Sequence, residues 1–245
     1  MRAILLTLCA ALAFGAPVLA GAQTPPPVMT RPAPPADPLV TPQELDLARI
    51  FPPPPADDSL AGLADLEAVL GIQAIRTREQ EAEARIDADL GAYDWARSIL
   101  GEGFDAVDYP LTTALLERVR RDGVQLVWES KGFYPRRDRP VERDGRVWRA
   151  LGGGHNDSSY PSARALGTRI WAGVLADVFP SRADDLMEAA DRSGWMRVTG
   201  GAHYPTDIAA SRILGDAFLA RLRANPEYQR LLAQAREEAR IVRAP

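Results

Sequence analysis

Apolar residues recur every three or four positions through most of the chain after residue 58, the spacing expected for helices with one buried face. The pattern is clearest in four sets: Leu60, Leu63, Leu66, Val69 and Leu70; Leu111, Leu115, Val119 and Val127; Leu166, Ile170, Val174 and Val178; Ile213, Ala217 and Leu219. Ser59 can cap the first helix, the stretch 76–85 continues it with a solvated face, and Gly123 is expected to break the second helix. No segment alternates as a strand does. We therefore predict one all-α domain over residues 59–245, with any chemistry in the segments between helices.

Residues 1–22 have the pattern of a secretory signal peptide. Arg2 precedes an apolar run over residues 3–19, and small residues end the segment before Gln23. A proline-rich stretch follows in place of the basic flank that a membrane anchor would have. Cys9 lies inside the segment, so the mature chain would contain no cysteine. We expect a periplasmic or secreted protein.

Residues 23–58 are rich in proline, which removes amide donors and favours extended polyproline conformations. This composition predicts a surface arm or spacer in which only the segment 41–50 makes a turn of helix. A recognition motif for a proline-binding partner is the alternative.

The length of 245 residues and an apolar fraction of 46% suit one globular domain. Twenty-nine Lys and Arg residues against 33 Asp and Glu residues give a formal charge of -4. This balance argues against a general nucleic-acid binder, which would carry a dominant basic surface. Lys131 is the only lysine in the sequence, and chance in an arginine-biased composition is the simplest explanation for it.

Two segments between the predicted helices combine charge with special backbone residues. Segment 131–140 holds four cations. A solvated basic loop that stabilises a helix C-terminus would explain them without a binding site. In segment 152–164, three glycines lead to Pro161, which we place in the first turn of a helix. The amides of Ser162 and Ala163 would then face an anion, although a plain capped helix start explains the same pattern.

A third segment, 196–207, carries a histidine followed by a carboxylate. Pro205 is expected to open a helix, with His203 just before it and Asp207 in its first turn. A carboxylate four residues after a histidine can accept a hydrogen bond from one ring nitrogen and leave the other free to attack or bind. A buried or surface histidine without chemistry is the ordinary explanation for either of the two histidines alone.

Together these segments resemble the signature of bacterial class A nonspecific acid phosphatases, which belong to the superfamily of type 2 phosphatidic-acid phosphatases and vanadium haloperoxidases. The matching residues are Arg139-Pro140, Tyr160-Pro161-Ser162, and Arg197 followed at the family spacing by His203 and Asp207. The resemblance implies the all-α fold of that superfamily. It also implies a metal-independent and cofactor-free phosphomonoesterase that acts on small phosphate esters through a phosphohistidine.

The resemblance assigns roles residue by residue. His203 would be the nucleophile and Asp207 its orienting partner. The phosphate ligands would be Lys131, Arg139, Arg197 and the amides of Ser162 and Ala163.

Three departures from the family pattern affect these assignments. Lys131 stands eight residues before Arg139 where the family has seven, and Pro135 is placed to absorb the extra residue in a kink. Met196 replaces a serine. Arg164 replaces the histidine that acts as general acid. Arginine is a poor proton donor but a strong phosphate ligand, so Arg164 is expected to bind phosphate.

Several functions follow from that replacement. The enzyme would act on activated esters, or another group would supply the proton; His155 is the first candidate and Asp157 a weaker one. Alternatively, the protein is a noncatalytic phosphate-binding relative, which Arg164 would favour. A vanadate-dependent oxidase using His203 as ligand is a more distant alternative, and the lack of later apolar spans disfavours a lipid phosphatase. The sequence leaves homo-oligomer formation open.

Overall fold

The computed structural model describes residues 30–151 and 157–242, and these residues form helices and connecting segments without a β-strand. The all-α prediction is confirmed. The α-helices are α1 Leu47–Ile50, α2 Leu60–Ile75, α3 Arg78–Asp89, α4 Ala92–Leu100, α5 Pro110–Phe133, α6 Pro140–Arg143, α7 Ala163–Val178, α8 Ala183–Thr199, α9 Pro205–Arg223 and α10 Pro226–Val242. Two short 3-10 helices are η1 Pro42–Glu44 and η2 Pro180–Arg182.

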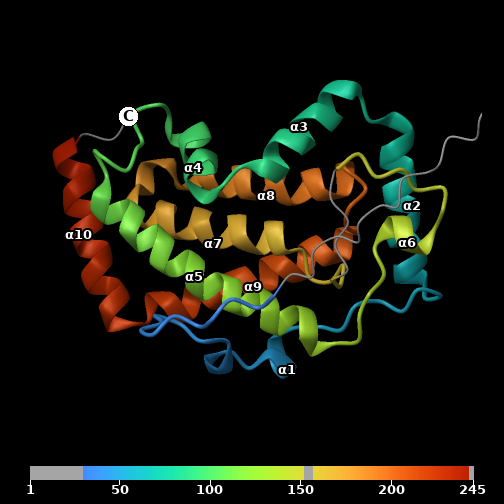
Figure 1. Cartoon of the computed structure of the whole chain (residues 1–245), viewed down its shortest axis with the longest axis horizontal. Coiled ribbons are helices and arrows are strands. Elements are labelled where there is room, and N and C mark those ends of the chain that lie inside the picture. Colours follow the sequence, from blue (N-terminus) through green and yellow to red (C-terminus); the bar gives the residue numbers. More distant parts are fainter. Residues whose placement is uncertain (1–29, 152–156, 243–245) are drawn as a thin grey trace, which may run out of the picture.

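Helix α7 lies at the centre of the molecule and packs against α5, α8 and α9 (Figure 1). Its apolar side chains Leu166, Ile170 and Val174 are buried as the sequence pattern predicts. The prediction that Gly123 breaks the neighbouring helix is wrong, because α5 runs through it without interruption. A Cβ atom at Gly123 would lie 3.3 Å from Ile170 Cδ1, so this glycine lets α5 approach α7 closely.

The predicted helix after Ser59 forms, and Ser59 caps it by accepting a hydrogen bond from the Gly62 amide at 3.1 Å. It does not continue through residues 76–85, because the chain leaves the helix at Arg76 and a second capped helix, α3, begins. The predicted buried face is confirmed in part. Leu66 and Val69 are buried as expected, whereas Leu60 and Leu63 at the start of the helix are exposed and Asp65 is buried.

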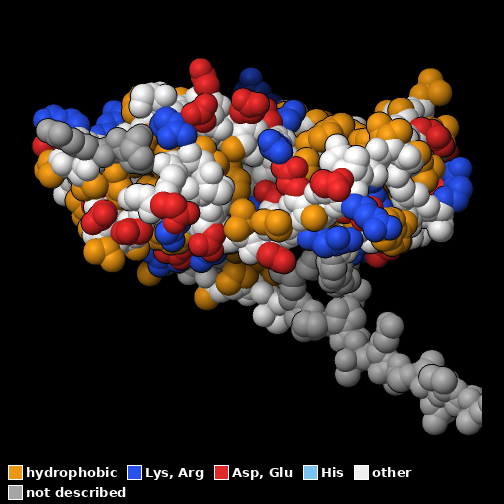
Figure 2. All heavy atoms as spheres, turned by 90° about the horizontal axis from the view of Figure 1, so that it is seen from above, with side chains coloured by type: hydrophobic (Ala, Val, Ile, Leu, Met, Phe, Trp, Pro, Cys, Tyr) orange, Lys and Arg blue, Asp and Glu red, His pale blue; other side chains and the backbone are white. Residues whose placement is uncertain are grey.

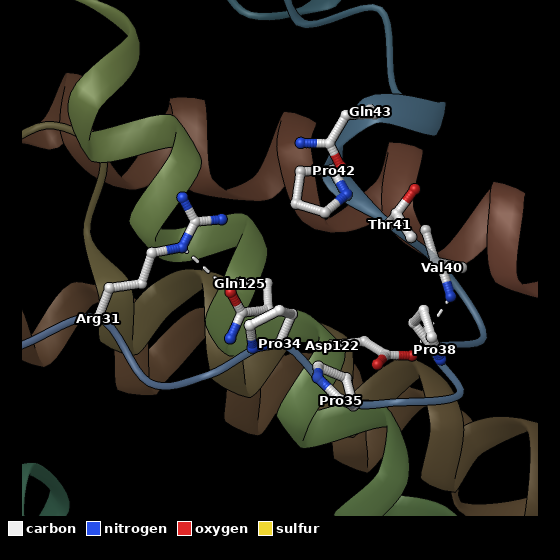
Figure 3. Close-up of a pocket in the computed structure, with 10 residues that line it drawn as sticks. All are labelled: Arg31, Pro34, Pro35, Pro38, Val40, Thr41, Pro42, Gln43, Asp122 and Gln125. Carbon is white, nitrogen blue, oxygen red and sulfur yellow. Dashed lines mark hydrogen bonds between the residues drawn. The ribbon is translucent and has the colours of Figure 1, made fainter.

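The proline-rich segment forms a turn of helix at the expected place, but from residue 31 onward it packs against the helical body. Leu39, Val40 and Phe51 are buried in the main apolar core. The arm runs along α5, where the Asp122 carboxylate accepts hydrogen bonds from the Leu39 and Val40 amides at 2.8 and 3.2 Å (Figure 3). The predicted boundary at residue 58 therefore does not separate a spacer from the core.

The arm also reaches the loop that precedes α7. The Phe51 ring stacks on Tyr160 with their centroids 5.1 Å apart, and the Tyr160 hydroxyl donates to the Pro52 carbonyl at 2.6 Å. The arm thus holds Tyr160 of this loop. The proline-rich arm therefore contributes to the position of this loop and is more than a spacer.

Acidic and basic side chains are interspersed on the face seen in Figure 2, in keeping with the small net charge. Within residues 30–151 and 157–242, no helix combines the length and apolarity that a membrane crossing requires.

Candidate active site

His203 and Asp207 form a buried pair where α8 gives way to α9. Helix α8 ends at Thr199, and Gly201 turns the chain with a φ of 68°, a conformation that favours glycine. The His203 amide donates to the Arg197 carbonyl at 3.3 Å, which ties the histidine to the last turn of α8. His203 Nδ1 lies 3.2 Å from Asp207 Oδ2, as the spacing predicts.

Asp207 is held by donors on every side. Its Oδ2 also accepts from the Ser159 hydroxyl at 2.6 Å and from the Tyr204 amide at 2.9 Å, while Oδ1 accepts from Arg137 at 2.7 Å. Tyr204 caps α9 and Asp207 is its third residue, so the cap and the histidine share one carboxylate oxygen. The prediction that Pro205 opens this helix is confirmed.

Arg137 connects Asp207 to a second buried carboxylate, Asp65 of α2. Its two terminal nitrogens donate to Asp207 and to Asp65, each at 2.7 Å. The guanidinium also lies over the Tyr204 ring, 4.1 Å from its centroid. Neither residue is marked as a site by the sequence, because Arg137 is one of four cations in segment 131–140 and Asp65 is one of two acidic residues of α2, with Glu67.

The surroundings of His203 favour a neutral imidazole. Burial lowers the pKa of His203 well below its usual value, while the hydrogen bond to Asp207 acts in the opposite direction. Arg139 NH1 lies 3.1 Å from Nε2 and can only donate there. The arrangement therefore fits a proton on Nδ1, shared with Asp207, and a lone pair on Nε2.

Arg139, Lys131 and Asp157 form the next group outward from His203. Arg139 NH2 donates to Asp157 Oδ1 at 2.7 Å, and Lys131 Nζ lies 3.0 Å from Asp157 Oδ2. Lys131 also donates to the Ser158 carbonyl. Helix α5 ends at Phe133 and the chain bends at residues 134–135, so the extra residue before Arg139 falls outside the helix and Lys131 still joins Arg139 on one carboxylate.

Two further arginines belong to this cluster. Arg197, in the last turn of α8, is buried, and its guanidinium makes no hydrogen bond with any described residue. Burial lowers the pKa of Arg197 to about 10. Arg149 has two buried guanidinium nitrogens, Nε and NH2, without partners in the described ranges, and sequence analysis gave no signal for it. Burial and the nearby charge of Arg139 lower the pKa of Arg149 as well.

The start of α7 differs from expectation at two residues. The helix begins at Ala163, with Ser162 as its cap and Pro161 before it, so Pro161 is not in the first turn. The Ser162 amide, expected to face an anion, donates to the Asp207 carbonyl at 3.4 Å. Ala163 lines a cavity beside Lys131.

Within the described residues no hydrogen bond or ion pair joins Arg164 to His203, although its charge is among those that lower the pKa of Arg197. The Arg164 guanidinium lies 3.3 Å from each oxygen of the Asp87 carboxylate and also donates to Ser193 Oγ and to the Leu90 carbonyl. These partners belong to α3, to the residue that follows it and to α8. With its donors used in this way, Arg164 connects α3 to α8, which differs from the expected role as a phosphate ligand.

His155, the first candidate for a substitute acid, lies outside the described residues. Asp157 is described, and its carboxylate is 29% exposed. Burial raises its pKa, but the charges of Lys131 and Arg139 outweigh burial and hold the pKa below the usual value. Asp157 is therefore ionised while it bridges these two cations. The described residues offer no cluster of three or more His, Cys, Asp or Glu side chains for a metal ion.

Comparisons with known proteins give one consistent result. The chain is 30% identical over 214 residues to a non-specific acid phosphatase of Salmonella typhi, covering 82% of this chain and 83% of the relative. It is 29% identical over 209 residues to the non-specific acid phosphatase of Providencia stuartii, covering 80% and 82% of the two chains. No protein-family model matches.

A solved structure of a bacterial vanadium-dependent iodoperoxidase has a similar fold, with a TM-score of 0.58 and 16% sequence identity. The matched region covers 71% of this chain and 52% of the iodoperoxidase chain. At this identity the likeness concerns the fold, and it confirms the helical architecture expected of the phosphatase and haloperoxidase superfamily.

Replacing Arg137 should destabilise the protein far more than replacing Arg136. Arg137→Met leaves Asp65 and Asp207 buried without their shared cation, and the loss of one partner of a buried ion pair costs about 3–5 kcal/mol. Arg136→Met removes exposed ion pairs and should cost less than about 1 kcal/mol. Urea unfolding of both variants measures the difference, and equal midpoints would contradict the role given to Arg137.

Proposed function

Because the chain belongs to the family of bacterial non-specific acid phosphatases, we propose that it hydrolyses small phosphomonoesters through a covalent phosphohistidine at His203. The observation that carries the proposal is the His203–Asp207 pair beside a group of cations. A neutral imidazole with its Nε2 lone pair turned toward Arg139 is the form that a nucleophile requires. Acid phosphatase activity is thus the function that the relatives and the site support together.

The first half-reaction begins when the phosphoryl group binds Lys131 and Arg139, the two cations that pair with Asp157 in the structure. Lys131, Arg139 and Arg197 carry full positive charges in a largely buried site, where charge–charge interactions are strong. His203 Nε2 attacks phosphorus, the bond to the ester oxygen breaks, and charge spreads over the equatorial oxygens. Asp207 keeps the Nδ1 proton and stabilises the positive charge that develops on the ring.

In the second half-reaction water attacks the phosphohistidine and releases inorganic phosphate. Asp207 remains fixed by Ser159, Tyr204 and Arg137, so the ring keeps its orientation through both steps. Asp65, Arg137 and Asp207 form a buried group with one net negative charge. This charge stabilises the positively charged ring of the phosphohistidine.

Wild-type protein should carry phosphate on His203 during turnover of 4-nitrophenyl phosphate. Rapid quenching with radiolabelled substrate should give an acid-labile label, and His203→Ala should lose the label together with about 10⁴-fold or more of kcat. His155→Ala is the matched control, because it removes the other histidine and should leave the label in place.

The labelling experiment also separates the two classes of function. Turnover without label on His203 would contradict the phosphohistidine. Phosphate binding without turnover of any ester would identify a noncatalytic relative.

Lys131 should give the enzyme an alkaline limit. Burial lowers the pKa of Lys131 to about 8, and the attraction of Asp157 only partly offsets this. The protonated lysine holds phosphate, so kcat/KM for 4-nitrophenyl phosphate, whose leaving group needs no proton, should be retained below pH 8 and fall above it. Lys131→Arg keeps its charge throughout this range and should move the fall to higher pH. An unchanged pH profile in Lys131→Arg would show that Lys131 does not set the limit.

We also propose that the protein is exported and loses residues 1–22. The support is the charged start, apolar run and small-residue end of this segment. Protein recovered from the periplasm or the medium of an expressing bacterium should begin at Gln23 by N-terminal sequencing. Ala22→Arg should block cleavage, and full-length wild-type protein in the membrane fraction would contradict the proposal.

A further inference from the structure

We propose that Asp157 donates the proton to the leaving alcohol, in place of the histidine whose position Arg164 occupies. The proposal rests on the proposed function, because it requires His203 to be the nucleophile. Arg164 itself is held by Asp87, Ser193 and the Leu90 carbonyl, and it has no proton to give.

The first argument is the position of Asp157 relative to His203. Both contact the same guanidinium: Arg139 NH1 lies 3.1 Å from His203 Nε2, and Arg139 NH2 lies 2.7 Å from Asp157 Oδ1. A phosphoryl group bound to Arg139 would therefore have the nucleophile at one end and the carboxyl at the other. Phosphoryl transfer needs the attacking and leaving groups roughly in line, so the leaving oxygen would face Asp157.

The second argument is the space beside Asp157. A cavity of about 280 Å³ opens there, with Lys131 and Asp157 on one side and the apolar side chains of Val127 and Trp128 in its lining. Ligand sites typically combine such apolar walls with a few polar groups. The organic part of an ester can occupy this cavity while its phosphoryl group lies on Arg139, which puts the bond to be broken next to the carboxyl.

The third argument explains how a carboxylate that is ionised at rest becomes an acid. Lys131 and Arg139 stabilise the charged form of Asp157, and the incoming phosphoryl oxygens need the same two cations. When phosphate takes them, Asp157 loses both partners and faces a second negative charge. Both changes favour protonation of the carboxyl. The monoanionic form of the ester brings the required proton into the site.

The proton and bond changes balance over the cycle. In the first step the His203 Nε2–P bond forms, the P–O bond to the alcohol breaks, and the proton on Asp157 passes to the leaving oxygen. In the second step the Asp157 carboxylate takes a proton from water as the water oxygen bonds to phosphorus and the P–N bond breaks. Phosphate then leaves, and the carboxyl returns its proton to solvent when it rebinds Lys131 and Arg139.

Dependence on the leaving group tests the proposal. With Asp157→Asn, kcat for ethyl phosphate should fall by about 10²- to 10⁴-fold, because an alkoxide leaves poorly without a proton. With 4-nitrophenyl phosphate kcat should fall by less than about 10-fold, because nitrophenolate needs no proton. Asp157→Glu should restore part of the ethyl phosphate activity.

Asp138→Asn is the matched control, since it removes an exposed carboxylate from a neighbouring segment that pairs with Arg136. It should leave both substrates unaffected, and thermal unfolding checks that each variant folds.

Three results would overturn the proposal. Asp157→Asn could slow both substrates equally, which would assign Asp157 a structural role. It could lower KM for both at unchanged kcat, and the carboxylate would then only compete with phosphate. His155→Ala could produce the leaving-group dependence in its place. Failure of the proposed function is distinguishable, because wild-type protein would then show no label on His203 with the aryl ester.

Discussion

The Asp207 carboxylate is the interaction on which the site depends. It is completely buried and accepts hydrogen bonds or ion pairs from His203, Ser159, Tyr204 and Arg137. A buried charge without such partners would cost several kcal/mol. These donors come from the loop before α7, from the segment between α5 and α6, and from the residues directly before α9. These three segments must therefore meet at one point.

The same requirement extends outward to the rest of the fold. Arg137 satisfies Asp207 only together with Asp65, which fixes α2 against α9. The Ser159 amide donates to the Arg137 carbonyl at 2.9 Å, and the next residue, Tyr160, stacks on Phe51 of the arm. The proline-rich arm and α2 are far from His203 in sequence, yet both contribute to the position of the carboxylate that orients it. Substitutions there should act on catalysis through geometry.

The sequence predicted the contact between His203 and Asp207 but not the residues that support it. The proline start of α9 and the His203–Asp207 contact follow from the spacing of neighbouring residues in the sequence. They can therefore be predicted without knowledge of the tertiary packing. The partners of Asp207 could not be predicted in this way, because Asp65 and Arg137 are separated by 72 positions and meet only through tertiary packing. The helical pattern after Ser59 identified Leu66 and Val69 as buried, but it also placed Leu60 and Leu63 on that face, and both are exposed while Asp65 is buried.

Arg164 shows why the chemistry of a replaced residue depends on where its side chain goes. Sequence alone suggested that arginine exchanges acid catalysis for phosphate binding. The guanidinium is instead occupied by Asp87, Ser193 and a backbone carbonyl, and its charge is neutralised by α3. The cations available to a phosphate would then be Lys131, Arg139, Arg149 and Arg197, and among the described carboxylates Asp157 bridges the first two. In the proposed function an anionic substrate takes these two cations from Asp157, so binding of the substrate and release of this carboxylate would be one event.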